Sequence, residues 1–273
     1  PLSHRGQPEG PPALTLERGS GVRDLTVWYP EQDARDPTPY PWTFGSTPAK
    51  SGDNATLLNV TLVNAYRGMR FGPEWNELHT IQNVVGCCLA AGVFVDTCTD
   101  IGRLTGVDLG PEWWERSGLP GAPRGADAAA LRAWMRREGI GVDILRSDWE
   151  YLYAVRARGY AAGFRFRPGA QGTTNAVMAD CHASGGAVGL LVEQLNAIGL
   201  AATACSFSGA EAGVRTAPGY TAVVQLQSCA LRASGGPAAD LRGNGTVTFQ
   251  ACRFAGARGP SLAAAQGVFT ALG

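Results

Sequence analysis

A repeat of about two dozen residues constrains the fold of this chain more than any other feature of its sequence. Four cysteines in the second half, Cys181, Cys205, Cys229 and Cys252, stand 24, 24 and 23 residues apart. A glycine that opens an apolar segment follows eight residues after Cys181, and another follows eight residues after Cys205. Because two markers share one period in register, the sequence predicts a solenoid of stacked units.

The repeats are built from strands. Alternating segments rich in β-branched residues recur in them, for example 59–63 and 246–249, and such alternation is typical of β-strands. A leucine-rich repeat can have this length, but its leucine signature is absent from the sequence. We therefore predict an all-β fold: a single-stranded parallel β-helix of about nine coils, forming one domain over residues 1–273 with a loose N-terminal segment at 1–19.

The cysteine column predicts the interior of the coil. The chain has seven cysteines, an odd number, and no Cys-x-x-Cys pair. A buried free cysteine behaves as a small hydrophobic residue, so we expect stacked thiols in this column rather than disulfides or metal ligands. The same offset places Val60, Val84 and Val155 in the column, an apolar residue each time.

Two stretches interrupt the period, at 29–40 and at 110–140. The second includes residues 126–138, where an aspartate near the start and two arginines near the end predict a short helix. Long connections in a tight solenoid are usually functional, so we expect both insertions to form walls of a groove along the glycine-led strands. The aromatic residues expected to be exposed on these walls are Trp28, Tyr29, Tyr40, Trp42, Trp113, Trp114 and Trp134.

Three stretches resemble one known family. They are residues 22–32 with 39–42, residues 76–79 with 92–103 and 111–113, and residues 147–151 with 163–166 and 192–194. In this order they are similar to the pectate-lyase-like proteins related to family-28 glycosyl hydrolases, over about residues 20 to 230. The resemblance implies a right-handed parallel β-helix that acts on a polysaccharide and is usually exported, which makes it secreted or periplasmic.

The family includes hydrolases, lyases and epimerases, and the resemblance does not carry over a catalytic motif. Polygalacturonases have Asn-Thr-Asp, Asp-Asp and Gly-His-Gly motifs at the turns that enter the glycine-led strands. Here these turns read 66–68 Tyr-Arg-Gly, 90–92 Ala-Ala-Gly and 161–163 Ala-Ala-Gly. An aligned set of calcium-holding aspartates like that of pectate lyases is absent from the sequence too. We therefore expect no metal and no cofactor, with calcium required only by a lyase.

Carboxylates gather where the glycine-led strands end. Asp96 closes one of these strands, Asp148 lies in a turn of the next coil, and Glu193 lies two coils beyond Asp148. Neighbouring coils are about 4.8 Å apart, and glycoside hydrolysis needs two carboxyl groups about 5 Å apart for retention or about 6.5–9.5 Å for inversion. We predict Asp96 and Asp148 as the catalytic pair, with Glu193 as the alternate partner. Asp100 lies just beyond Asp96.

Other side chains complete the predicted site. Glu31 opens the first insertion beside aromatic residues, which suits a general acid. The residues predicted to bind substrate are Arg70, Asp143 and Arg165, on the outward column of the glycine-led strands, and the aromatic Trp28, Tyr29, Trp113 and Trp114. The alternative is structural: the carboxylates form salt bridges with arginines in the turns, and Glu31 caps a turn.

Composition and charge limit the function classes. Basic and acidic residues balance at 23 each, which argues against a nucleic-acid partner. The sequence contains no run of 18 uncharged apolar residues, so we predict no membrane span. We predict a glycoside hydrolase whose partner is an extended polysaccharide that can carry acidic sugars. The alternatives are a polysaccharide lyase and a non-catalytic, tailspike-like carbohydrate-binding adhesin. Because both ends lack an obvious cap, we expect an oligomer such as a trimer, or a capping segment outside this sequence.

Overall fold

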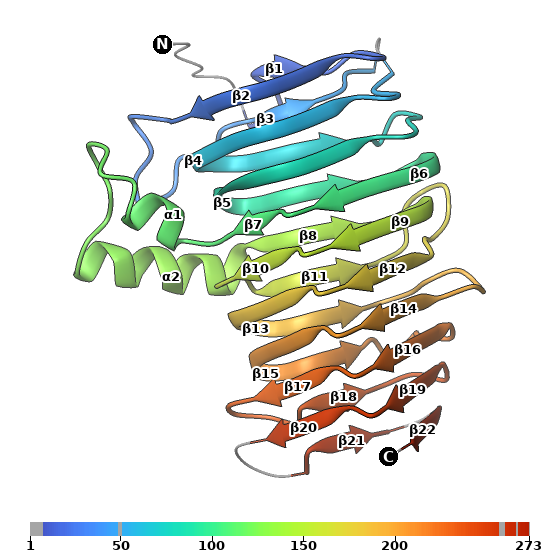
Figure 1. The fold of residues 1–273 in the computed structure, drawn as a ribbon. Coiled ribbons are helices and arrows are strands. Elements are labelled where there is room, and N and C mark those ends of the chain that lie inside the picture. The colour runs from blue at the N-terminus through green and yellow to red at the C-terminus, as the bar shows by residue number, and fades with distance from the viewer. Residues whose placement is uncertain (1–7, 49–50, 257–259, 266, 273) are drawn as a thin grey trace.

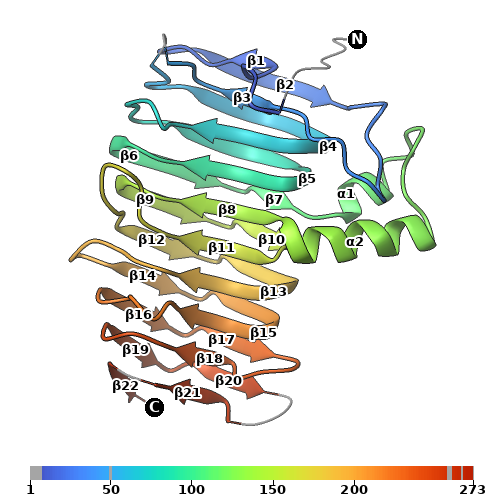
Figure 2. The ribbon, with the colours of Figure 1, turned by 180° about the vertical axis from the view of Figure 1, so that it is seen from behind.

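The computed structural model describes residues 8–48, 51–256, 260–265 and 267–272. It shows an all-β parallel solenoid of about nine turns with two short helices, so the predicted fold class is confirmed. Figures 1 and 2 show the coils stacked from β1 near the N-terminus to β22 near the C-terminus, with both helices at one side of the stack.

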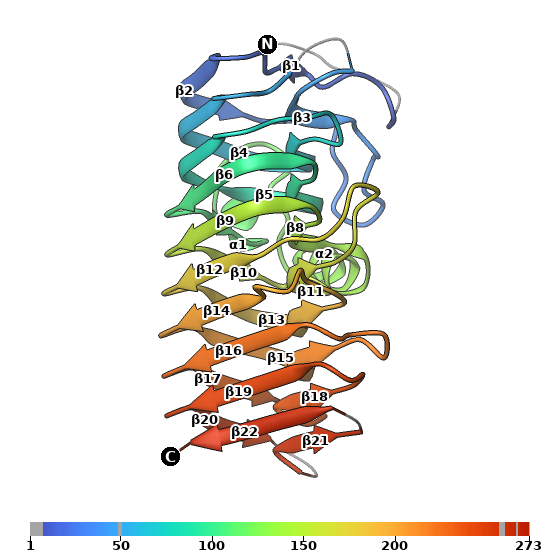
Figure 3. The ribbon, with the colours of Figure 1, turned by 90° about the vertical axis from the view of Figure 1, so that its right-hand side faces the viewer.

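Each coil contributes to three faces, and every pairing between named strands is parallel. The long strands β4 (Thr56–Phe71) and β5 (Thr80–Val95) run through all three faces, and β2 (Gly21–Val27) through the first two. The first face continues through β6 (Cys98–Thr105), β9 (Ser147–Tyr153), β12 (Ala176–Ala179), β14 (Leu200–Thr203), β16 (Val223–Gln227), β19 (Thr246–Gln250) and β22 (Val268–Leu272). Figure 3 shows these strands one above another.

The other two faces hold the segments recognised from the sequence. The second face, which follows the cysteine column, comprises β7 (Asp108–Leu109), β10 (Arg156–Arg158), the first halves of β13 (His182–Val192) and β15 (Ser206–Thr216), β17 (Ala230–Ala233) and β20 (Arg253–Gly256). The third face, of glycine-led strands, comprises β1 (Leu14–Thr15), β3 (Trp42–Gly45), β8 (Ile140–Ile144), β11 (Ala162–Phe166), the second halves of β13 and β15, β18 (Ala239–Leu241) and β21 (Leu262–Ala264).

The cysteine column lies where the period placed it. The residues that directly follow the four cysteines pair with one another from coil to coil, so the thiols stack on one interior line. Val60, Val84 and Val155 are buried on the same line. All seven cysteines of the chain are free thiols. The core of each coil is therefore filled by apolar residues that repeat with the period.

A left-handed residue marks the corner between the first and second faces. These positions have φ between 50° and 62°, and they are Asp24, Asn59, Asn83, Gly106, Ala154, Asp180, Ala204, Ser228 and Ala251. Asparagine and aspartate tolerate this conformation better than most residues. Their side chains also bond between coils, as from Asn83 Nδ2 to Asn59 Oδ1 at 3.2 Å. The corner turns the chain sharply once in every coil.

The second insertion forms α1 (Glu112–Glu115) and α2 (Ala126–Glu138). The second helix confirms the predicted helix at 126–138, whereas α1 was not predicted. The two insertions, expected as walls of a groove, meet each other: Arg35 of the first forms an ion pair with Asp127 of the second. Among the described residues, neither helix has the length and apolar content that a membrane crossing requires.

Candidate functional site

Asp96 closes β5, as predicted, but its carboxylate faces the protein. The residue is 4% exposed. Its Oδ1 accepts hydrogen bonds from the backbone N–H of Thr97 at 2.8 Å and from that of Arg146 at 3.2 Å. A Cβ at Gly169 would lie 2.4 Å from the same oxygen. The backbone at Gly169 therefore covers the carboxylate from the other side. These contacts give Asp96 a structural role in joining two coils.

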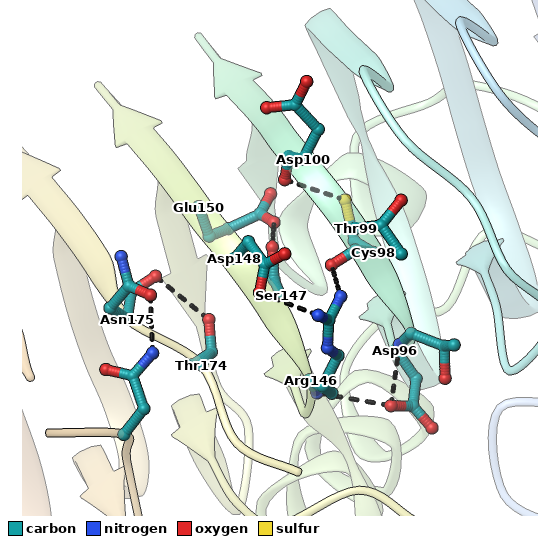
Figure 4. Close-up of polar contacts among 12 residues, drawn as sticks. Asp96, Cys98, Thr99, Asp100, Arg146, Ser147, Asp148, Glu150, Thr174 and Asn175 are labelled. Carbon is teal, nitrogen blue, oxygen red and sulfur yellow. Dashed lines mark hydrogen bonds and ion pairs between the residues drawn. The ribbon is translucent and has the colours of Figure 1, made fainter. Parts of the chain in front are cut away.

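Asp148 is open to solvent and pairs with Arg146. Its side chain is 48% exposed, and its Oδ1 lies 2.8 Å from Arg146 Nη2. The same guanidinium donates to the backbone carbonyl of Cys98 on the preceding coil. Arg146 therefore lies between Asp96, which accepts from its backbone, and Asp148, which pairs with its side chain, as Figure 4 shows.

A β-bulge brings a second exposed carboxylate next to Asp148. In the pairing of β6 with β9, Cys98 lies opposite Ser147 and Ile101 opposite Trp149. Two residues of β6, Thr99 and Asp100, therefore face the single residue Asp148. Bulges of this kind re-aim side chains and are frequent next to active sites. Asp100 and Asp148 were expected in turns, and both belong to strands on neighbouring coils.

Asp100 has rotational freedom. It is exposed, and in Figure 4 its carboxylate points away from that of Asp148. The backbones of the two strands are about one sheet spacing apart, about 4.8 Å. Exposed side chains change rotamer within nanoseconds, so rotation about χ1 can turn the Asp100 carboxylate from this orientation toward Asp148.

Aromatic side chains border these carboxylates, and of these Trp149 is partly buried and Tyr151 is exposed. Trp149 and Tyr151 alternate along β9 and stack with ring centroids 6.0 Å apart and an interplanar angle of 16°. Tyr153, the next outward residue, is 58% exposed. Trp75 is 57% exposed, and the guanidinium of Arg146 lies 5.8 Å from its ring centroid. Together these four rings form a surface that we call the aromatic strip.

The first face continues beyond the aromatic strip without charge. In register with Tyr151 and Tyr153, the outward residues of the next four coils are Val177, Ala179, Ala201, Thr203, Gln225, Gln227, Thr248 and Gln250. A shallow hollow of about 100 Å³ lies among the last of these. Amides and hydroxyls donate and accept hydrogen bonds without carrying charge, which suits the hydroxyl groups of a neutral sugar.

A buried ion pair supports the site from below. His79 Nε2 lies 3.1 Å from Glu150 Oε1, and both side chains are completely buried. Ser147 Oγ donates to Glu150 Oε2 at 3.0 Å. Burial lowers the pKa of His79, but the Glu150 carboxylate and a hydrogen bond with the Cys98 thiol outweigh it and raise this pKa to about 10. The inward residues of β9 therefore anchor the strand whose outward residues are Asp148, Trp149 and Tyr151.

The predicted substrate-binding side chains of the third face make contacts within the protein. The Asp143 carboxylate is buried and accepts two hydrogen bonds from Arg165, at 2.8 and 2.7 Å, and further ones from Arg167. Arg70 donates to the carbonyl of Ser46 at 2.7 Å. Glu193 is partly buried and its charge acts on Arg165. The binding role of Arg70, Asp143 and Arg165 and the catalytic role of Glu193 stay predictions, and the observed contacts stabilise the third face.

Tyr29, Tyr40 and Trp114 were expected to be exposed but are buried, and the other aromatic residues of the insertions are partly buried. Tyr29 is 6% exposed and its hydroxyl lies 2.8 Å from Thr43 Oγ1, and Trp114 is 1% exposed. The expectation that these rings are exposed is wrong, because each packs into the core and anchors its insertion. Trp28 and Trp113 are partly buried, and Glu31 is exposed. The predicted roles of these three residues stay predictions.

A Ser–His–Asp chain of hydrogen bonds lies on the second face. His182 bonds to Asp180 Oδ1 through Nε2 at 2.7 Å and to Ser206 Oγ through Nδ1 at 3.0 Å. Acyl transfer also needs N–H donors for the oxyanion, but the N–H of Ser206 already bonds to the carbonyl of Cys181. These hydrogen bonds therefore serve as a structural contact between two coils.

In comparisons with known proteins, no family model, no curated protein and no solved structure matches this chain. The similarity to pectate-lyase-like proteins is therefore supported at the level of the β-solenoid, a fold that is compatible with carbohydrate-active proteins.

The aromatic strip was not predicted from the sequence, although a signal for three of its four rings was present. Trp149, Tyr151 and Tyr153 alternate with period two in one segment, as outward residues of a strand do. The inward residues of the same segment include Ser147 and Glu150, so the usual apolar alternation was not visible.

Proposed function

We propose that this protein binds an extended polysaccharide along its first face and hydrolyses it with Asp100 and Asp148. The observation that carries the proposal is the β-bulge that sets these two exposed carboxylates on neighbouring coils beside the stacked rings of Trp149 and Tyr151. A sugar ring has an apolar face that packs on an aromatic ring, while its hydroxyls bond to polar side chains.

The acid and the base follow from the surroundings of each carboxylate. Asp148 is paired with the Arg146 guanidinium, which suits the role that requires a carboxylate: it takes a proton from the attacking water or attacks the sugar itself. Asp100 supplies the proton to the leaving glycosidic oxygen. One water is consumed and one new reducing end forms for each bond broken. Asp96, which the sequence predicts as the partner of Asp148, fixes the backbone beneath them through its contacts with Thr97 and Arg146.

The test is a polysaccharide panel assayed for new reducing ends. We expect Asp100→Asn and Asp148→Asn each to lower turnover by about 10²–10⁴, the usual contribution of a positioned acid or base. Asp36→Asn is the matched control, because Asp36 is an exposed aspartate of the first insertion. Full activity in both the Asp100 and the Asp148 variants would refute the assignment. Products with near-ultraviolet absorbance would instead identify a lyase.

A second function, binding without catalysis, is favoured by the open form of the first face. The aromatic strip and the uncharged residues beyond it form a long surface on parallel strands. Tight oligosaccharide binding that needs Tyr151 and Tyr153, without any new reducing ends over the whole panel, would support this function over hydrolysis.

A further inference from the structure

The second insertion covers part of the second face. Helix α1 packs against β4 and β5, and α2 packs against β5 and β13. Trp114 of α1 and Met135 of α2 are buried in the core and fix both helices to the solenoid. Figure 1 shows the helices beside β7, β8 and β10. The insertion is therefore anchored firmly at defined points.

Between the anchors Trp114 and Met135, the insertion does not contact the strands closely. A cavity of about 630 Å³ lies between it and the outward side chains of β2, β4, β7 and β10. Its apolar lining includes Val63, Trp113 and Leu119, and the hydroxyls of Thr26 and Thr61 also line it. The cavity opens to solvent, and its volume lies in the range of small-molecule sites.

A charged cluster lies where this cavity adjoins a neighbouring one. Arg158 Nη1 lies 2.5 Å from Asp108 Oδ1, and Arg158 Nε donates to Glu112. Arg158, Glu112 and Arg116 line both cavities. The two cavities therefore share residues and adjoin each other.

The neighbouring cavity, of about 300 Å³, has a cationic lining. Arg116, Arg132, Arg136 and Arg158 line it with a single carboxylate, that of Glu112. Arg132 pairs with Glu115. Within the described part of the chain, no carboxylate lies within ion-pair distance of Arg116 or Arg136, and Arg136 Nε donates only to the carbonyl of Gly185, at 3.2 Å. The guanidinium groups of Arg116 and Arg136 can therefore bind an anionic ligand, because guanidinium groups bind carboxylates and phosphates well.

We propose that the two cavities together bind one small ligand, a monosaccharide that carries an anionic group. The anionic group binds between Arg116 and Arg136, and the sugar ring lies in the adjoining end of the larger cavity against Trp113, with its hydroxyls near Asp108. This site is on the second face and uses none of the residues proposed for hydrolysis on the first face.

The test is calorimetric titration of the whole chain with three probes at fixed ionic strength: glucuronate, glucose and inorganic phosphate. We expect glucuronate to bind at least about tenfold more tightly than either of the others, because only glucuronate has both the ring and the charge. Equal affinity for glucose would refute the role of the arginines, equal affinity for phosphate would refute the role of the ring, and no binding of glucuronate at millimolar concentration would refute the site.

Two matched variants locate the binding. Arg116 is exposed and has no ion-pair partner in the described residues, so Arg116→Gln should fold normally and weaken glucuronate binding about tenfold, as expected for the loss of one charge-assisted contact. Arg137→Gln also removes one positive charge, from a residue of α2 that lies outside both cavities. This variant should change the affinity for glucuronate less than twofold. Equal weakening by both variants would overturn the proposal. Asp148→Asn should leave this binding unchanged whether or not it abolishes hydrolysis, so the two proposals can fail separately.

Discussion

Replacing Gly102 by alanine should break the buried ion pair beneath the candidate site. His79, Gly102 and Glu150 occupy the same inward position on three successive coils. Glu150 reaches His79 across the coil in between, and the two side chains meet at 3.1 Å. A Cβ at Gly102 would lie 2.4 Å from Glu150 Oε2 and from ring atoms of His79. The contact therefore exists only because this residue has no side chain.

The expected cost follows from two opposing terms. Separating a buried ion pair leaves charge without a partner and costs about 3–5 kcal/mol. Gly102 is not in the left-handed region, so alanine restricts the unfolded chain and returns about 0.4–1 kcal/mol. The net loss of unfolding free energy should be about 2–4.6 kcal/mol.

The assay is urea unfolding followed by far-ultraviolet circular dichroism, with midpoints and slopes compared because solenoids can unfold in parts. Gly21→Ala is the matched control: Gly21 lies on β2 of the same face, and a Cβ there would meet its nearest atom at 3.4 Å. We expect a lower midpoint for Gly102→Ala alone. A Gly102→Ala protein as stable as the parent would refute the account of the ion pair.

The pH dependence gives an independent check on the same pair. The pKa of His79 is raised from 6.5 to about 10 in the folded protein, where burial opposes the charge and Glu150 and Cys98 favour it. A group with a raised pKa stabilises the fold fully below its unfolded pKa, and the contribution is lost as the pH rises through the folded pKa. The stability difference between parent and Gly102→Ala should therefore be largest below about pH 6.5 and shrink toward pH 10. A difference that grows with pH would contradict this.

Three further predictions concern packing and exposure. Trp114→Ala should lower the unfolding free energy by about 3–5 kcal/mol, because a fully buried ring is removed; a thermal or urea scan measures it, and a loss below 1 kcal/mol would contradict the anchoring role. Arg35→Ala should cost less than about 1 kcal/mol in the same scan, because its ion pair with Asp127 is solvent-exposed. In the native protein only Cys252, the one cysteine that is not fully buried, should react with a thiol reagent, and slowly because burial raises its pKa; rapid reaction of several thiols would contradict the interior column.

The fold could be predicted because its signal repeats. The spacing of the cysteines fixed the interior line, and the same offset placed Val60, Val84 and Val155 on it correctly. A solenoid repeats each local choice once per coil, so one recognised column defines the register of its neighbours. The helix at 126–138 was recognised from its charge pattern, because its environment differs from that of the strands.

The site was harder to predict because it departs from the repeat. In the sequence, Asp96 and Asp100 both lie close to the end of a glycine-led strand, and nothing distinguishes their exposure. The bulge places Asp100 opposite Asp148 in the structure, where it is exposed. Burial of Tyr29 and Trp114 could not be read from the sequence either. An aromatic residue in an insertion can anchor the insertion or line its surface, and both uses have the same composition.

The departures from the repeat have a common physical basis. A regular coil places every outward side chain at one spacing along a nearly flat face, which gives an extended surface but few points where several groups converge on a ligand. The bulge in β6 brings Asp100 opposite Asp148, and the insertion between β7 and β8 forms one side of a cavity on a face that would otherwise be open. Both depend on buried anchors that a regular coil does not need, the His79–Glu150 pair under one and Trp114 under the other. Polar or bulky residues buried at irregular positions of a solenoid are therefore a guide to the outward residues directly above them.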